Sequence, residues 1–173
     1  MLSVLYNFHN STCKLEGNLL ENKDKSIQVV YQDGVYKRAD QIIPLYEKYG
    51  NCCVEHLKDA LSFCLYDKNK NQLLVVRDRI GEKQLYYAQL PTGVVFADSL
   101  KDVLQYVKRP QIRIHELAQP IRHNYPIDLQ HTWIEQIKRV RAGEYAIADT
   151  DGLRLYTYWK RNHTVAFQGT KEE

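Results

Sequence analysis

Cysteine is the residue type in this chain best suited to covalent chemistry, and four are present: Cys13, Cys52, Cys53 and Cys64. Cys64 lies within the apolar run LSFCLY, where a thiol is typical of a small core residue. Cys52 and Cys53 are adjacent, so they do not form the Cys-x-x-Cys spacing of a redox pair or a zinc site. Four cysteines are also too few for a disulfide scaffold in a chain of this length.

Other common catalytic and cofactor motifs are missing from the sequence. Its eight glycines form neither a Gly-x-Gly-x-x-Gly loop nor a Walker A loop, and no Ser-Gly-Gly-x-Asp-Ser pyrophosphate loop is present. His115, His123 and His131 are spaced eight apart, not at the i, i+4 spacing that places two ligands on one helix face. We expect no metal, no cofactor and no ATP activation on this chain.

Residues 77–87 (RDRIGEKQLYY) form the most specific segment of the sequence. A carboxylate stands between two guanidinium groups at the end of an expected strand, and a glycine-containing turn and a strand with paired tyrosines follow. We expect a structural role, since the segment offers no nucleophile and no base poised near neutrality. The residues of this motif are Arg77, Asp78, Arg79, Gly81, Lys83, Tyr86 and Tyr87.

Short apolar runs separated by turn signals predict the sheet that carries this segment. Strands are expected at residues 60–66, 73–77, 85–90 and 94–97, and they would form one antiparallel meander. A helix over residues 100–107 has Leu100, Val103, Leu104 and Val107 on one face, and that face is expected to cover the sheet.

The rest of the chain mixes helices and strands in blocks. Further strands are expected at residues 3–8, 26–31, 143–148 and 153–158, and residues 10–25 are a polar stretch. Helices are expected at residues 39–49, where Pro44 must begin, kink or break the helix, and at 53–58, 115–123 and 133–140. Without a regular βαβ alternation, the pattern predicts the α+β class.

Length and composition set the remaining bounds. The 173 residues predict one domain over residues 1–160, and residues 161–173 form a polar tail or the start of a linker. A net charge of +3 is too small to imply nucleic acid, and no apolar run approaches the roughly 20 residues of a membrane span. Few cysteines and no visible secretion signal favour a soluble protein in a reducing cytoplasm.

Residues 77–87 resemble the Arg-Asp-Arg-x-Gly-x-Lys-Pro-Leu-Tyr-Tyr signature of the class II glutamine amidotransferase domain of asparagine synthetases. Other family segments are similar in the same order, at residues 46–50, 60–67, 96–101, 132–145 and 158–159. The resemblance therefore covers roughly residues 26–159, most of the chain.

This resemblance implies an N-terminal-nucleophile hydrolase fold, in which two stacked, mainly antiparallel sheets lie between helical layers. The family activity is glutamine hydrolysis, which supplies ammonia to a neighbouring synthetase domain. That chemistry needs an N-terminal cysteine whose thiolate attacks the amide, a free α-amine as base, and donors that hold the oxyanion.

The glutamine site departs from the family pattern at four places. Leu2 stands where family members have cysteine, and the Arg-Gly-Pro-Asp loop has no counterpart between residues 8 and 26. The Asn-Gly-Glu motif is reduced to a segment containing Asp33 and Gly34. Arg38 takes the place of the aspartate that binds the substrate ammonium, although a two-residue shift would put Asp40 there. Asp33, Gly34 and Asp40 remain weak candidates for substrate binding in a shortened N-terminal half.

Together these departures predict a catalytically inactive glutaminase-like domain that acts as a structural or docking element. Its expected partner is an asparagine synthetase-type ATP-using domain or chain, contacted through residues 117–133 and 158–159, and a homodimer is also possible. One alternative is an active glutaminase that uses Cys13 after removal of residues 1–12 as a propeptide. Another is a free-standing binding module for an amino acid or a leader peptide.

Overall fold

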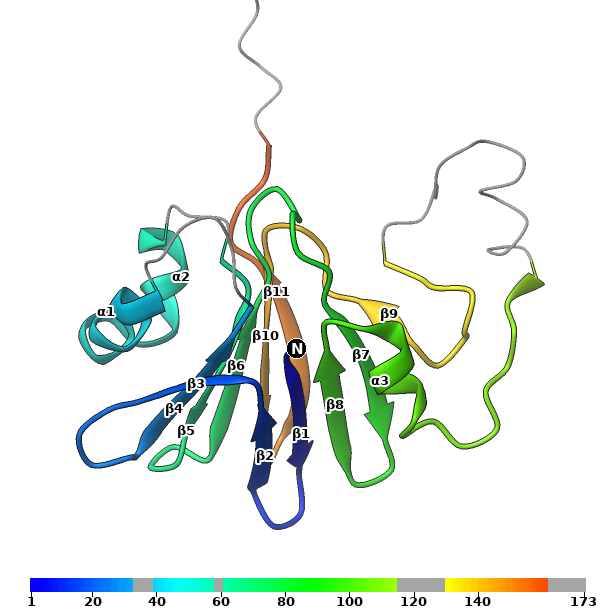
Figure 1. The fold of residues 1–173 in the computed structure, drawn as a ribbon, viewed down its shortest axis with the longest axis horizontal. Coiled ribbons are helices and arrows are strands. Elements are labelled where there is room, and N and C mark those ends of the chain that lie inside the picture. Colours follow the sequence, from blue (N-terminus) through cyan, green and yellow to red (C-terminus); the bar gives the residue numbers. More distant parts are fainter. Residues whose placement is uncertain (33–38, 58–60, 115–129, 162–173) are drawn as a thin grey trace, which may run out of the picture.

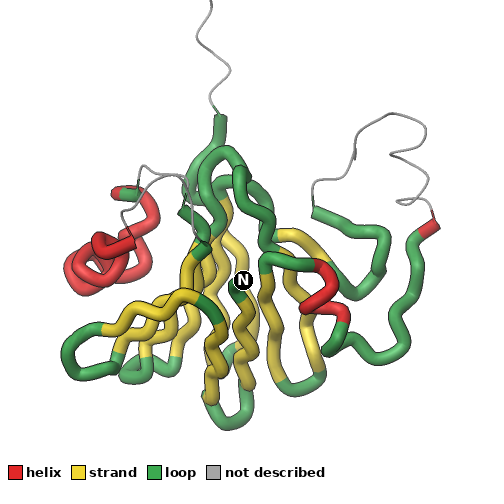
Figure 2. Tube along the Cα trace, viewed as in Figure 1, coloured by secondary structure: helices red, strands yellow, loops and turns green. Residues whose placement is uncertain are grey.

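The computed structural model describes residues 1–32, 39–57, 61–114 and 130–161. Two antiparallel sheets stack face to face, and helices lie on the outer side of each sheet (Figures 1 and 2). An apolar cluster with residues from both sheets, including Tyr6, Tyr66 and Phe96, fills the space between them. The expected α+β class and the two-sheet sandwich are confirmed.

The first sheet has five strands in the order β2-β1-β8-β7-β9. Its strands are β1 (Ser3–Asn7), β2 (Thr12–Glu16), β7 (Tyr86–Leu90), β8 (Gly93–Ala97) and β9 (Lys138–Arg139). β1 pairs with β2 on one side and with β8 on the other. Leu2, Val4 and Tyr6 alternate along this segment and are fully buried, so its inward face contributes directly to the core between the sheets.

The second sheet has six strands in the order β11-β10-β6-β5-β4-β3. Its strands are β3 (Asn18–Glu21), β4 (Ile27–Tyr31), β5 (Phe63–Asp67), β6 (Gln72–Val76), β10 (Glu144–Asp149) and β11 (Gly152–Thr157). β2 and β3 come from the polar stretch of residues 10–25, for which no strand is predicted from the sequence. Both are at sheet edges, where one face and one backbone edge can meet water.

The predicted single meander over residues 60–97 is wrong in one respect. Its four strands are antiparallel, but β5 and β6 belong to the six-stranded sheet and β7 and β8 to the five-stranded sheet. All residues of β5 and of β8 are buried, so both faces of each hairpin need a cover. Stacking the hairpins in separate sheets, with a helical layer outside each, buries both faces. Residues 77–85 carry the chain from one sheet to the other.

Helices α1 (Ile42–Tyr49) and α2 (Cys53–His56) cover the outer face of the six-stranded sheet. Pro44 lies in the first turn of α1, where its missing N–H costs no helical hydrogen bond. On the other side α3 (Leu100–Leu104) packs on the five-stranded sheet and is shorter than predicted. It ends early because the backbone amides of Tyr106 and Val107 donate hydrogen bonds to the carbonyls three residues earlier, and these bonds tighten the last turn.

The helix predicted over residues 133–140 is absent. The buried hydroxyl of Thr132 accepts from the Ile134 amide and lies within hydrogen-bond distance of the Ile134 and Ile137 carbonyls, which holds this segment in turns. Ile134, Ile137 and Val140 are buried at the three-residue spacing of a helix face, but the two residues between Ile137 and Val140 form strand β9. Residues 115–123, also predicted to be helical, lie outside the described residues.

Candidate functional site

The head of β1, by which we mean Met1 and Leu2 just before the strand, is where the family resemblance places the nucleophile. The Leu2 amide donates to Asp98 Oδ2 at 2.8 Å, and the Asp98 amide donates to the Leu2 carbonyl at 3.1 Å. The Met1 ammonium lies 3.7 Å from the same carboxylate oxygen. The Leu2 side chain is fully buried in the core between the sheets and has no nucleophilic atom. Asp98 therefore holds the start of β1 in place, and Leu2 cannot act as a covalent nucleophile there.

The weak substrate candidates do not gather at this strand head. Asp40 is exposed in the short helical turn Ala39–Gln41, which precedes α1 and belongs to the layer outside the six-stranded sheet. Asp33 and Gly34 lie outside the described residues. Gln32, which directly precedes them, is buried; its amide group donates to the Gln84 carbonyl at 2.9 Å, and its Oε1 has no partner. Gln32 thus joins the end of β4 to the crossover between the sheets.

Cys13 lies in β2, opposite Tyr6 near the far end of β1. Its half-buried side chain packs against the core cluster that contains Cys64, and burial raises the pKa of the Cys13 thiol to about 12. A thiol with this pKa stays protonated near neutrality, whereas a nucleophilic cysteine acts as the thiolate. Cys64 is fully buried between the sheets, as its apolar surroundings predict.

The crossover begins with Asp78, whose side chain is almost fully buried. Its carboxylate accepts from the Glu82 amide at 2.9 Å, the Lys83 amide at 3.2 Å and the Ser62 hydroxyl at 3.1 Å. These hydrogen bonds hold the turn after β6 around the carboxylate. The carboxylate's partners are thus backbone amides and a hydroxyl, while Arg79 extends to the Glu55 carbonyl at 3.0 Å.

Arg77 spans the crossover from the other side. Its guanidinium donates to three carbonyls, those of Lys83 at 2.8 Å, Val140 at 2.6 Å and Gly81 at 3.2 Å. The Tyr158 hydroxyl in turn donates to the Arg77 carbonyl at 2.9 Å. Because a guanidinium presents several donors in a fixed plane, one side chain fixes the turn and the segment before β10 together.

The remaining motif residues pack around this turn. Gly81 has φ +71°, and a Cβ there would lie 3.0 Å from the Ala142 side chain and 3.2 Å from Arg77 Nη2. Tyr87 is buried against Phe96, and the Tyr86 ring lies under the Arg139 guanidinium at 5.7 Å. Arg139, in the basic segment of residues 138–141, is therefore packed against the motif.

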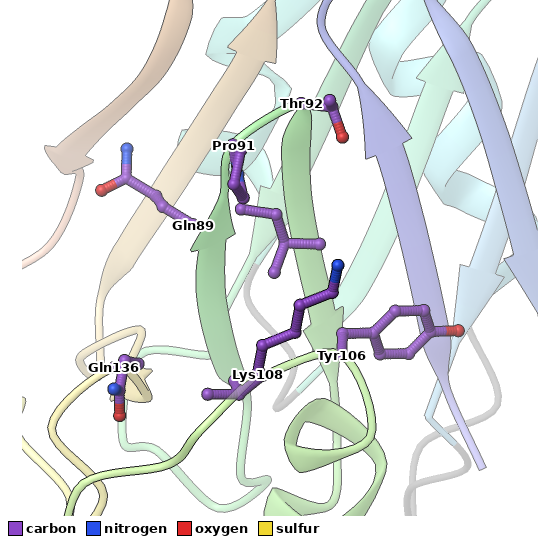
Figure 3. A pocket seen from close by; sticks show the side chains of 8 residues that line it. Gln89, Pro91, Thr92, Tyr106, Lys108 and Gln136 are labelled. Atoms are coloured by element: carbon purple, nitrogen blue, oxygen red, sulfur yellow. The ribbon is translucent and has the colours of Figure 1, made fainter.

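A hollow of about 430 Å³ opens at the turn between β7 and β8, beside the end of α3. Figure 3 shows its lining side chains, among them Pro91, Tyr106 and Lys108. The described residues of the lining include no cysteine, histidine or carboxylate. It lies at the other end of the sheet from Leu2, since Ala97 pairs with Ser3 while Gly93 pairs with Asn7. This hollow is therefore separate from the head of β1.

The described residues contain no group of three or more His, Cys, Asp or Glu side chains placed to hold a metal ion. None of the helices in these ranges has the length and apolar character that crossing a bilayer requires.

Two stacked antiparallel sheets between helical layers are the fold of the N-terminal-nucleophile amidotransferases. Solved structures with this fold superpose on the chain. A glutamine phosphoribosylpyrophosphate amidotransferase from Bacillus subtilis, complexed with ADP and GMP, matches 86% of this chain and 32% of its own, with a TM-score of 0.53 and 11% identity. A structure described as the allosteric regulatory enzyme of purine biosynthesis matches 90% of this chain and 34% of its own, also with a TM-score of 0.53 and 11% identity.

The family model of the glutamine amidotransferase domain matches residues 35–159, and the chain belongs to this family. A putative glutamine-hydrolyzing asparagine synthetase 2 of Methanocaldococcus jannaschii is 36% identical over 70% of this chain and 24% of its own length. Amidase chry2 of Gibberella zeae is 30% identical over 73% of this chain and 18% of its own length. Glutamine-hydrolyzing asparagine synthetase 2 of Bacillus subtilis is 28% identical over 78% of this chain and 19% of its own length. The chain thus spans less than a third of each of these relatives.

Several residues that build this region do not stand out in the sequence. Ser62, Gln84 and Tyr158 form hydrogen bonds with residues 16, 52 and 81 positions away, respectively. Asp98 does fall in a family-like segment, residues 96–101, but its bond to the Leu2 amide joins residues 96 positions apart. Such partners follow from the stacking of the sheets and have no local signal.

Proposed function

We propose that this domain does not hydrolyse glutamine and instead serves as a structural and docking element for an ATP-using, amide-forming domain or chain. The observation that carries the proposal is the environment of Leu2. Its side chain is fully buried, and its backbone amide is bonded to Asp98. A γ-glutamyl thioester requires a sulfur at this place, and leucine has none.

The alternative nucleophile, Cys13, is poorly placed. Making Cys13 the first residue would remove residues 1–12, and with them β1 and its ladders to β2 and β8. The five-stranded sheet would be interrupted in its interior, and Leu2, Val4 and Tyr6 would leave the core. The raised pKa of the Cys13 thiol is a second argument against this mechanism, because little thiolate would form near neutrality.

The docking part of the proposal is supported by the relatives and by the end of the described chain. Several relatives are named as glutamine-hydrolyzing asparagine synthetases and are three or more times longer than the matched segment. Tyr158 and Trp159 both donate their amides to the Gly143 carbonyl, so the segment after β11 is fixed on the sandwich. We propose this segment as one contact with the partner, inside the cytoplasm. Residues 117–129 of the other proposed contact lie outside the described residues.

The test of inactivity measures ammonia release from glutamine by the full chain. We expect a rate equal to that of buffer, no adduct with a thiol-directed glutamine analogue on residue 1 or 2, and no effect of Cys13→Ala. An active amidotransferase domain serves as the positive control. A chain shortened before Cys13 by intact mass, with ammonia release that Cys13→Ala abolishes, would overturn the proposal.

The test of docking uses co-expression with an asparagine synthetase-type ATP-using chain encoded beside this one. We expect the two chains to co-elute in gel filtration, and we expect Trp159→Ala to weaken the complex. Trp133 is an exposed tryptophan at the border of the other proposed contact, so Trp133→Ala tests that second surface. Separate elution of two folded chains at micromolar concentration would count against a docking role.

A further inference from the structure

A cleft of about 410 Å³ lies where the crossover, the turn before β10 and the segment after β11 meet. In Figure 1 these three segments come together at one end of the sandwich, beside the point where the described chain ends. The charged and aromatic residues of the lining are Arg79, Arg141, Glu144, Trp159, Lys160 and Arg161. Its described lining includes neither Leu2 nor Asp98 and shares no residue with the hollow beside α3.

The backbone at Gly143 builds this cleft. Gly143 has φ +71°, and a Cβ there would lie 2.4 Å from the Trp159 carbonyl oxygen, so the close approach of the two segments requires glycine. The Tyr158 and Trp159 amides donate to the Gly143 carbonyl, and the Gly143 amide donates to the Asp78 carbonyl at 3.0 Å. All three walls are thus held to one another by backbone hydrogen bonds, so the cleft is preformed.

The charge of the cleft is unbalanced. Among the described lining residues the one carboxylate is that of Glu144, and it is paired with Arg141, whose Nε and Nη2 donate to Oε1 at 2.8 and 2.6 Å. Arg79 donates from Nη2 to the neutral Glu55 carbonyl, and its Nε is buried with no acceptor among the described residues. Lys160 and Arg161 have no carboxylate partner within the described part of the chain. Three positive charges therefore face one small hollow and concentrate its potential.

We propose that this cleft binds a diphosphate group. Guanidinium groups match phosphate oxygens with paired donors, and a lysine ammonium adds a further charge on a flexible stem. A single carboxylate would neutralise one of the three unpaired cations, whereas a diphosphate brings several charges into a space of this size. Trp159 beside the cations offers an apolar surface for a base, so the diphosphate can come from free pyrophosphate or from a nucleotide.

Calorimetric titration of the full chain at low salt tests the proposal and separates the two sources. We expect saturable one-to-one binding of pyrophosphate, with orthophosphate bound about tenfold or more weakly because fewer charges are paired. ADP bound more tightly than pyrophosphate, with the difference lost in Trp159→Leu, would identify a nucleotide as the ligand. Equal affinities would identify the diphosphate alone.

Charge-removing variants at exposed positions keep the test independent of folding. Lys160→Gln and Arg161→Gln are each expected to weaken pyrophosphate binding about fivefold or more, because each removes one of the three unpaired charges. The matched control is Lys101→Gln, an exposed lysine on α3 at the other side of the molecule, which should change binding less than twofold. No saturable binding by the folded wild-type chain, or equal weakening in Lys101→Gln, would overturn the proposal.

Discussion

Ser62 and Asp78 are joined by two hydrogen bonds although 16 residues separate them. The Ser62 hydroxyl donates to Asp78 Oδ2 at 3.1 Å and accepts from the Asp78 amide at 3.2 Å. Ser62 precedes β5 and Asp78 follows β6, so the pair closes the open end of this hairpin just where the chain leaves for the other sheet. The same carboxylate then holds the next turn through the Glu82 and Lys83 amides.

Replacing this carboxylate should destabilise the fold. Asp78→Ala leaves two amides and a hydroxyl without their acceptor in a buried place, so we expect the free energy of unfolding to fall by about 3 kcal/mol. Urea denaturation measures the change. Asp151→Ala is the matched control, because the Asp151 side chain is 82% exposed, and it should change stability by less than about 0.5 kcal/mol. Equal effects of the two variants would contradict a structural role for Asp78.

The turn at Gly81 gives a second prediction. Gly81→Ala should lower the free energy of unfolding by about 1–2 kcal/mol, because φ is +71° and the new methyl group would lie 3.0 Å from the Ala142 Cβ. Repeating the substitution in an Ala142→Gly background removes the contact but keeps the backbone conformation. A smaller loss in that background is expected, and the same loss in both would show that the contact contributes nothing.

Stability should also fall at alkaline pH. Burial raises the pKa of the Cys13 thiol to about 12, whereas an unfolded cysteine titrates near pH 8.5. Between these values the unfolded chain loses a proton that the folded chain keeps, so the free energy of unfolding decreases as pH rises. Below about pH 8 this contribution is fully present.

Cys13→Ala isolates that contribution. From about pH 9 to 11 its free energy of unfolding should decrease less steeply than that of the wild type, by up to about 1.4 kcal/mol per pH unit. Leu15→Ala, in the same strand and against the same core cluster, removes packing but no titrating group and should keep the wild-type slope. Identical slopes for wild type and Cys13→Ala would refute the prediction.

Deleting residues 1–12 tests the place of β1 directly. This deletion removes an interior strand of the five-stranded sheet and three fully buried side chains, so we expect loss of the cooperative thermal transition and aggregation in gel filtration. Deleting residues 162–173 is a control of equal length, and we expect it to fold because the sequence predicts a polar tail there. A folded chain that begins at Cys13 and releases ammonia from glutamine would contradict both the structural role of β1 and the proposed inactivity.

The sequence alone predicts the family, the sandwich and most strands. These features depend on local patterns: short apolar runs in β4 to β8, turn residues between them, and the family-specific segment of residues 77–87. Pro44 and the buried Cys64 also follow from their immediate neighbours. Each is decided within a few residues, where side-chain sterics and hydrophobicity act directly.

Long-range pairing decides the remaining features. Which sheet receives each hairpin depends on covering both faces of β5 and β8, and β2 becomes a strand because β1 supplies its hydrogen bonds. Thr132 prevents a helix that the apolar spacing of residues 133–140 predicts. The basic cleft exists only in the folded chain, because Arg79 and Lys160 are 81 positions apart and meet through the backbone bonds around Gly143. Local patterns cannot encode such contacts, since they are formed by groups that approach one another only after the sheets have stacked.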